Sequence, residues 1–269
     1  MRSILEAAGV VFADSETRWL LQAATGSTTA LLMDGSDIDE STELRAIELA
    51  RRRAGGEPLQ YVTGVEGFRH LELVVGPGVF IPRPETELVA ERAMDRLPRG
   101  GTLVDVGTGS GAIALAVAHE RSDARVLATD ASGTALAWAE KNRDALGLSV
   151  ELIRCDLLGG LPAELREEVD VVVSNPPYVP QGGDGLLARD VVRYEPHEAL
   201  FAGGGGLEMI GRVAARARGW LRRRGWLVLE IGYDQAHAVK NILHDLQYER
   251  VSVTRDLAGR DRIAEGCHG

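Results

Sequence analysis

Four residues that could orient an NH2 group follow a short run of valines. Residues 171–173 are all valine, a β-branched run typical of a buried parallel strand. Asn175-Pro176-Pro177-Tyr178 comes one residue later, and the strand should end there because a proline has no backbone donor. Each proline also favours an extended conformation in the residue before it. We therefore expect the Asn175 side chain and the Pro176 carbonyl at the carboxyl end of a strand, where open α/β sheets bind ligands.

The Asn175 side-chain oxygen and the Pro176 carbonyl are both acceptors, and an NH2 group offers two donors. An amide or arylamine nitrogen is a poor nucleophile because its lone pair is delocalised. Two acceptors that bind both N–H bonds would orient the nitrogen and return electron density to it. Tyr178 adds a flat face on which a planar group can stack. The alternative is an ordinary turn, which Asn-Pro often begins.

A glycine-rich turn is the second feature that could do chemistry. Residues 102–106 are a predicted strand, Gly107-Thr108-Gly109-Ser110-Gly111 the turn, and residues 112–118 a helix of small side chains. Glycines let the backbone turn tightly and approach a ligand closely. The next predicted strand, 125–129, is followed by Asp130, an acidic residue placed to bind two ribose hydroxyls.

This turn alone leaves two cofactor classes open. Gly107, Gly109 and Ala112 also satisfy a dinucleotide-binding fingerprint. Asp105, two residues before the first glycine, favours a methyltransferase. The Asn175–Tyr178 segment on a later strand makes a nicotinamide cofactor the weaker interpretation.

The segment Asn175-Pro176-Pro177-Tyr178 resembles the motif of S-adenosylmethionine-dependent methyltransferases that modify glutamine amides or the exocyclic amines of bases. The resemblance implies catalytic roles for Asn175, Pro176 and Tyr178, and acceptor binding by all four residues. It implies S-adenosylmethionine as cofactor and S-adenosylhomocysteine as product. The implied cofactor-binding residues are Asp105, Gly107, Thr108, Gly109, Ser110, Gly111, Asp130, Asp156, Leu157 and Asn175.

Asp156 and Leu157 follow a predicted strand over residues 150–154. In methyltransferases of this kind the corner holds the adenine, whose amino group a carboxylate accepts. Asp156 could equally cap the turn before Pro162. Many members have an aromatic residue where this chain has Leu157, and leucine can pack on the adenine ring but cannot stack.

Further segments resemble the HemK/PrmC-type release factor glutamine methyltransferases, and together they cover nearly the whole chain. They are Glu57–Gly64, Phe80–Glu87, Tyr194–Leu200 and Gly203–Leu207, the last with glycine at 205 where the family commonly has aspartate. The resemblance implies a helical substrate-docking domain over 1–64, a β-hairpin linker over 65–82 and a methyltransferase domain over 83–269. The implied fold is α/β, a class I Rossmann-like sheet of seven strands, mostly parallel with the last antiparallel.

Local signals place the N-terminal helices. Ser15 and Ser41 are predicted helix caps, and Gly55-Gly56 is the predicted end of the second helix. Arg51–Arg53 lie in its last turn, either as a solvated helix end or as a docking patch for a partner.

Signals in the C-terminal half predict one long functional loop and the remaining strands. The loop over 179–206 is too long for a plain connection and is predicted to be functional, with His197 a hydrogen-bonding residue rather than a base. Strands are predicted at 225–232, 249–254 and 261–264, with a helix at 235–246.

Composition limits the class of protein. The chain has 269 residues, 45% of them hydrophobic, and a net charge of −10, which disfavours a protein that binds nucleic acid stably. Cys155 and Cys267 are far apart, without disulfide or metal-ligand spacing, which favours a reducing cytoplasm and predicts no metal. Residues 1–15 lack a signal-peptide core, and no apolar run approaches membrane-spanning length.

The resemblance implies methyl transfer to the side-chain nitrogen of the glutamine in the Gly-Gly-Gln (GGQ) motif of class I peptide chain release factors. Such a displacement disperses charge and needs no strong base, so none is assigned. A ribosomal-protein glutamine methyltransferase would differ mainly in its partner. An N(6)-adenine nucleic acid methyltransferase would need a basic groove with stacking aromatics. A silent binding protein is disfavoured because both motifs are intact.

Overall fold

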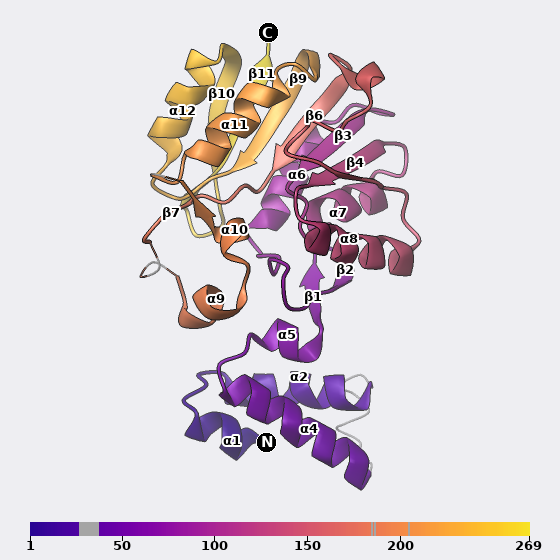
Figure 1. Cartoon of the computed structure of the whole chain (residues 1–269), viewed down its shortest axis with the longest axis vertical. Coiled ribbons are helices and arrows are strands. Elements are labelled where there is room, and N and C mark those ends of the chain that lie inside the picture. Colours follow the sequence, from indigo (N-terminus) through magenta and orange to yellow (C-terminus); the bar gives the residue numbers. More distant parts are fainter. Residues whose placement is uncertain (27–37, 184, 186, 204) are drawn as a thin grey trace.

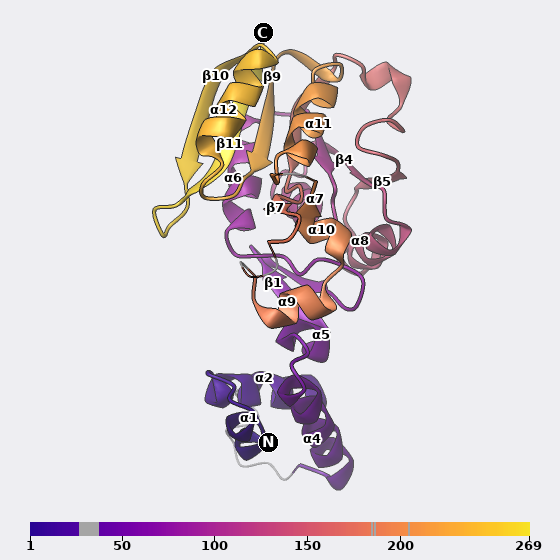
Figure 2. The same ribbon diagram turned by 60° about the vertical axis from the view of Figure 1, so that its left-hand side comes forward.

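The computed structural model describes residues 1–26, 38–183, 185, 187–203 and 205–269. A group of N-terminal helices, a short hairpin and a large sheet domain follow one another along the long axis of the molecule, and the C-terminus lies at the far end (Figures 1 and 2). The helices are α1 (Arg2–Ala7), α2 (Ala13–Thr25), α4 (Glu40–Ala54), α5 (Leu59–Thr63), α6 (Thr86–Arg96), α7 (Ala112–Glu120), α8 (Gly133–Leu146), the 3-10 helix η1 (Ala163–Leu165), α9 (Arg189–Tyr194), α10 (His197–Leu200), α11 (Glu208–Ala217) and α12 (Ala236–Asp245).

The strands form one large sheet and two small ribbons. They are β1 (Val65–Phe68), β2 (Leu71–Val74), β3 (Thr102–Val106), β4 (Arg125–Asp130), β5 (Glu151–Arg154), β6 (Val169–Ser174), β7 (Val179–Pro180), β8 (Phe201–Ala202), β9 (Leu221–Glu230), β10 (Tyr248–Arg255) and β11 (Asp261–His268). The large sheet has seven strands in the order β10-β11-β9-β6-β3-β4-β5, and β11 runs antiparallel to both of its neighbours. The predicted mostly parallel sheet with an antiparallel last strand is confirmed.

Strands at the centre of the sheet are buried on both faces, which explains their unbroken apolar sequences. All six residues of β6 are buried. Val171 and Val173 pack on the face covered by α6 and α7, whereas Val172 packs on the face covered by α11 and α12. This alternation is the period of two that a strand imposes.

The strand order reverses between β3 and β6. From β3 the chain moves outward through β4 and β5, then returns to β6 on the other side of β3 and continues to β9. The carboxyl ends of β3 and β6 therefore flank the point at which a doubly wound sheet opens for a ligand.

The hairpin β1–β2 packs on the sheet domain. Its side chains Phe68, Leu71 and Leu73 belong to the same core as α6 and α7. The buried amide of Asn142 on α8 fixes it further: Oδ1 accepts from Val74 N at 2.7 Å, and Nδ2 donates to the carbonyls of Val74 and Ser110, each at 3.0 Å. Asn142 thus joins the hairpin to the glycine-rich turn.

The predicted caps of the N-terminal helices are wrong by two or three residues. Helix α2 begins at Ala13 after Phe12, and Ser15 Oγ instead donates to Phe12 O at 3.1 Å. Helix α4 is capped by Asp39, whose Oδ1 accepts from the Thr42 N–H at 2.8 Å. Helix α2 thus begins without any side-chain cap, and α4 is capped by an aspartate two residues before the predicted serine. Gly55 at the C-cap of α4 confirms the predicted helix end.

Two of the three arginines at the end of α4 form ion pairs within the domain. Arg53 Nε lies 2.6 Å from Glu16 Oε2 on α2, and Arg52 Nη2 lies 2.5 Å from Glu57 Oε1. Arg51 and Arg52 are exposed, as expected of a solvated helix end, whereas Arg53 is half-buried and its ion pair with Glu16 joins α4 to α2.

Candidate active site

A cavity of about 430 Å³ lies at the carboxyl ends of β3, β4 and β6. Its volume is within the range of small-molecule sites. Both predicted motifs line it: the glycine-rich turn after β3 contributes Gly107, Thr108 and Ser110, and the segment after β6 contributes all of Asn175–Tyr178. The fold thus brings together two segments that are more than sixty residues apart in the sequence.

Backbone geometry explains the glycines of the turn. Gly107 has φ +72°, Gly109 +58° and Gly111 +88°, all in the left-handed region that glycine adopts without strain. At Gly107 and Gly109 a Cβ atom would meet nothing within 4 Å, so the backbone borders open space. The amides of Gly107 and Thr108 both donate to the carbonyl of Thr129, which ties the turn to the end of β4. Gly109 and Gly111 shape the turn without lining the cavity.

Asp130 at the end of β4 holds the turn as well as lining the cavity. Its Oδ2 accepts from Gly109 N at 3.0 Å, and its Oδ1 accepts from Ser132 N at 2.8 Å. Burial raises the pKa of Asp130 above its ordinary value, although these backbone donors oppose the rise. Each carboxylate oxygen still has a second lone pair for a ligand hydroxyl.

Asp105 is the most deeply buried carboxyl of the cavity, with 1% of its surface exposed. Its Oδ2 accepts from Thr108 Oγ1 at 2.6 Å and from Ala114 N at 3.2 Å. Its Oδ1 is buried and has no hydrogen-bond partner among the described residues. Desolvation raises the pKa of Asp105 to about 7. A buried acceptor without a partner is costly, and a cationic or donor ligand would satisfy it.

Asp156 and Leu157 also line the cavity, at its more exposed edge. The Asp156 side chain is 68% exposed, and both of its oxygens accept from Arg212 Nη2, at 3.0 and 2.9 Å. Leu157 has φ +53°, a left-handed conformation that is unusual for leucine. Among the described residues, no N–H of the turn before Pro162 donates to the Asp156 carboxylate. Its adenine contact remains a prediction.

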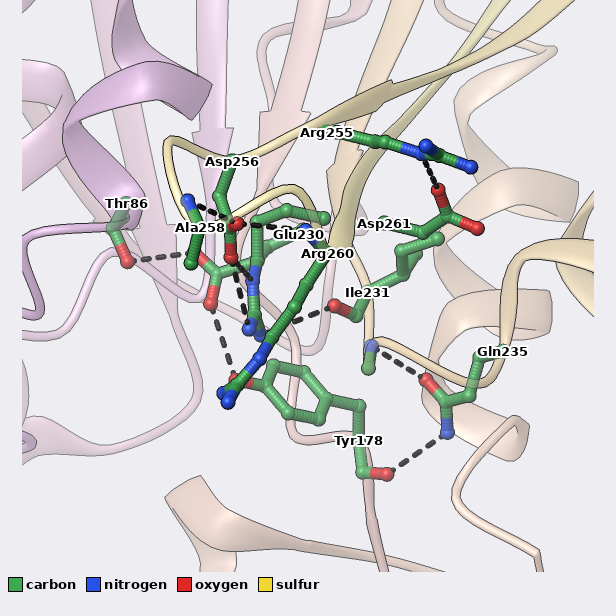
Figure 3. A network of polar contacts seen from close by, with 12 residues as sticks. Thr86, Tyr178, Glu230, Ile231, Gln235, Arg255, Asp256, Ala258, Arg260 and Asp261 are labelled. Atoms are coloured by element: carbon green, nitrogen blue, oxygen red, sulfur yellow. Dashed lines mark hydrogen bonds and ion pairs between the residues drawn. The ribbon is translucent and has the colours of Figure 1, made fainter.

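Residues Asn175–Tyr178, the acceptor segment, are fixed by hydrogen bonds to side chains that the sequence analysis did not identify as functional. Asn175 Nδ2 donates to Thr86 Oγ1 at 3.2 Å, and Thr86 Oγ1 donates to Glu230 Oε2 at 2.6 Å. The Tyr178 hydroxyl donates to Glu230 Oε1 at 3.2 Å, while Gln235 Nε2 donates to the Tyr178 carbonyl at 3.0 Å. Figure 3 shows Thr86 and Tyr178 converging on the Glu230 carboxylate.

The signals for Thr86 and Glu230 were weak but present. Thr86 is the first residue of α6, a position at which threonine is common for reasons of helix formation alone. Glu230 is the last residue of β9, where a strand of the parallel set ends at the ligand-binding edge. An acidic residue that ends a buried strand is unusual enough to be a candidate. Its partners, however, come from other elements and cannot be read from sequence.

The predicted functional loop folds over the cavity as α9, α10 and the two-stranded ribbon β7–β8. Buried Glu195 fastens it: Oε1 accepts from Arg83 Nη2 at 2.5 Å, and Oε2 accepts from Ile81 N at 3.2 Å. His197 Nε2 lies 3.0 Å from Val192 O, which confirms its prediction as a loop hydrogen-bonding residue. Gly205 has φ +87°, and Gly204 of the same segment lies outside the described residues.

Negative charge dominates the cavity wall. Among the described residues of the wall, Asp105, Asp130, Asp156 and Glu198 are acidic, and the one guanidinium is that of Arg83, which is paired with Glu195. The apolar remainder includes Phe80, Pro82, Ile113 and Leu200. This combination suits a ligand that carries positive charge and has flat or apolar parts.

No set of three histidine, cysteine, aspartate or glutamate side chains in the described part of the chain could hold a metal ion. Within those same ranges, every helix is too short or too polar to cross a membrane.

Family models match two parts of the chain: the PrmC N-terminal domain over residues 1–64 and the methyltransferase small domain over 71–223. The chain is 41% identical to a release factor glutamine methyltransferase of Neisseria gonorrhoeae, over 93% of this chain and 92% of that protein. It is 40% identical to the protein of that name from Mycolicibacterium smegmatis, over 96% and 92%. A methyltransferase from Pyrococcus furiosus shares the fold, with a TM-score of 0.56 at 19% identity over 74% of this chain and 89% of that one. These similarities extend over both the helical domain and the cavity, and the chain belongs to the family of release factor glutamine methyltransferases.

Proposed function

We propose that this chain transfers a methyl group from S-adenosylmethionine to the side-chain amide nitrogen of the glutamine in the GGQ motif of class I peptide chain release factors. The observation that carries the proposal is the single cavity that joins an acidic glycine-rich turn to the acceptor segment Asn175–Tyr178. Membership of the family supports the reaction, and the cavity contains groups that suit both the cofactor and the glutamine amide.

The cofactor fits the residues that are present. The carboxyl group of Asp105 lines the cavity and would attract a positively charged ligand, since its Oδ1 has no hydrogen-bond partner among the described residues, and Asp130 offers carboxylate oxygens to hydroxyl groups. Gly107 lines the cavity and lets a ligand approach the backbone, because a side chain there would occupy the open space that the ligand needs. Leu157 and Asp156 would hold the adenine at the outer edge. Bound in this way, the cofactor supplies a methyl group activated by a sulfonium.

The acceptor side needs hydrogen-bond acceptors and no base. No described residue hydrogen-bonds to Asn175 Oδ1, and no described backbone N–H donates to Pro176 O. These two atoms would accept the two N–H bonds of the glutamine amide and orient its nitrogen. Tyr178, fixed at its hydroxyl and at its carbonyl, would stack against the amide plane, and Pro177 would complete the wall. Apolar side chains of the cavity wall such as Phe80, Ile113 and Leu200 would lower the local dielectric constant, which strengthens both hydrogen bonds.

The helical domain supports a folded protein as the partner. Val11 and Phe12 are 85% and 70% exposed at the start of α2. They line a groove whose other wall is α9, with Arg189 and Arg193. The residues after α9 continue to the cavity through Pro196 and Glu198. We infer that a release factor docks on this groove while its GGQ loop enters the cavity. Glycines beside the glutamine avoid side-chain clashes in a narrow entrance.

The proposal is tested with methyl-labelled cofactor and purified substrates. Intact release factor should be labelled, and a short GGQ peptide should be labelled more weakly because it lacks the docking surface. Changing the glutamine of the release factor to glutamate should abolish labelling, since a carboxylate has no N–H to donate. Label on DNA or RNA but not on the release factor would support the nucleic acid alternative. Label on ribosomal protein alone would support a ribosomal-protein glutamine methyltransferase.

The buried carboxyl of Asp105 predicts a pH dependence of cofactor binding. Its pKa in the free protein is about 7, so below that pH the group is protonated and must release a proton to face a cation. Affinity should rise roughly tenfold per pH unit toward pH 7 and level off above it. Calorimetry from pH 5.5 to 7.5 in two buffers of different ionisation enthalpy should detect the released proton. Asp105→Asn should bind more weakly at every pH and release none, and a wild-type affinity independent of pH would contradict the assignment.

A further inference from the structure

The two ends of the Asn175 amide have opposite polarity, so its rotation about the last side-chain bond decides what it offers to a substrate. The oxygen end accepts from a substrate NH2 group, whereas the NH2 end would repel it. Asn175 Nδ2 lies 3.2 Å from Thr86 Oγ1, and this contact sets the orientation. What Thr86 can offer to Asn175 depends on where its single hydroxyl hydrogen points.

That hydrogen is committed to Glu230. Thr86 Oγ1 lies 2.6 Å from Glu230 Oε2, and a carboxylate can only accept. Thr86 must then accept from Asn175, which turns the NH2 end toward Thr86 and the oxygen end toward the cavity. The Tyr178 hydroxyl donates to the other Glu230 oxygen at 3.2 Å. One ionised carboxylate therefore orients Tyr178 directly and Asn175 through Thr86, and Figure 3 shows the contacts of Thr86 and Tyr178 with Glu230.

We propose that Glu230 is a positioning residue that acts through Thr86 to fix the acceptor end of the Asn175 amide toward the substrate. The inference rests on the proposed function, since it assumes that Asn175 Oδ1 binds the glutamine NH2 group. When Glu230 gains a proton on Oε2, it donates to Thr86 Oγ1 instead. Thr86 then donates to Asn175, the amide turns over to accept, and its NH2 end faces the substrate. The enzyme is inactive in that arrangement.

The surroundings of Glu230 determine the pH at which it gains this proton. Glu230 is 1% exposed. Thr86 of α6 and Tyr178 donate to it, Glu85 next to α6 adds negative charge, and Arg262 of β11 adds positive charge. Arg262 also pairs with Asp256, whose Oδ2 lies 3.4 Å from Arg262 Nε, so its positive charge does not compensate Glu230 alone. Burial raises the pKa of Glu230 to about 7 despite the donors and Arg262.

The test is the pH profile of kcat at saturating cofactor and release factor, because saturation removes the effect of Asp105 on binding. For the wild type, kcat should rise roughly tenfold per pH unit below about pH 7 and reach a plateau above it. Thr86→Val interrupts the connection while leaving Glu230 in place. In this variant, kcat should no longer fall below pH 7. Its value above pH 7 should be lower than that of the wild type by up to about tenfold, the effect of one lost hydrogen bond.

Conservative variants separate positioning from folding. Thr86→Ser keeps the hydroxyl, so its kcat should again fall below about pH 7 as in the wild type. Glu230→Gln has the same shape but cannot ionise, so its kcat should be low and independent of pH. Glu265→Gln is the matched control: Glu265 is a buried glutamate of β11 that pairs with Arg92 and Arg96, away from the acceptor. Its kcat should still fall below about pH 7 as in the wild type, even if the protein melts earlier.

Failure of this inference is distinguishable from failure of the proposed function. Suppose that the wild type methylates the release factor and that its kcat falls below about pH 7. If Thr86→Val or Glu230→Gln showed the same fall in kcat, the proposed role of Glu230 would be overturned. A wild type whose kcat does not change from pH 5.5 to 8 would overturn it as well. A wild type with no activity on the release factor would instead contradict the proposed function, whatever the variants do.

Discussion

Asn175→Ala should lower the turnover of release factor methylation about 10²- to 10³-fold, the loss typical of one oriented contact in a closed site. The variant removes the side-chain oxygen that we propose to accept one N–H of the substrate, and Pro176 O alone would not orient the nitrogen. Turnover is measured with labelled cofactor at saturating concentrations of both substrates. Cofactor affinity, measured by calorimetry, should fall much less, because Asn175 faces mainly the acceptor.

Asn241→Ala is the matched control for this prediction. Asn241 is exposed on α12 and does not line the cavity, so its removal should leave turnover unchanged. Near-normal turnover in Asn175→Ala, with the protein folded, would refute the proposed binding of the glutamine NH2 group by Asn175 and Pro176.

Asp130→Ala should weaken the binding of S-adenosylmethionine roughly 10- to 100-fold, which corresponds to about 1.5–3 kcal/mol for a charge-assisted hydrogen bond. The variant loses the proposed contact to the ribose and also the hydrogen bond that Gly109 N donates to Asp130 Oδ2 at 3.0 Å. Calorimetry gives the affinity, and thermal unfolding reports the looser turn. Unchanged affinity would exclude Asp130 from the cofactor site.

Asp123→Ala separates these two effects. Asp123 also accepts from a backbone amide in a turn, Gly100 N at 2.7 Å, but does not line the cavity. It should lower thermal stability without changing cofactor affinity. If both aspartate variants weakened binding equally, the role of Asp130 would be structural only.

Features encoded within a few neighbouring residues were predictable from sequence. The valines of β6 and the glycines after β3 specify a buried strand and a tight turn, and parallel strands bring their carboxyl ends to one edge. Helix starts were predicted less well, because Asp39 and Ser41 are both acceptable caps and only the packed structure chooses Asp39. The domain boundaries after residues 64 and 82 remain predictions.

The network behind the acceptor segment could not be predicted from sequence for a different reason. Thr86 and Glu230 are separated by 144 residues and meet only because α6 packs beside β9. Neither has a local signature: the threonine resembles a helix start, and the glutamate resembles the end of a strand. Their joint role follows from the direction of the hydrogen bonds, which requires coordinates.

Mass spectrometry of a class I release factor tests the central claim most directly. The protein should be isolated from cells with this chain intact, from cells lacking it, and from cells that carry Asn175→Ala in its place. We predict one methyl group on the glutamine of the GGQ motif in the first sample, and little or none in the other two. Full methylation of that glutamine in cells lacking the chain would contradict the account.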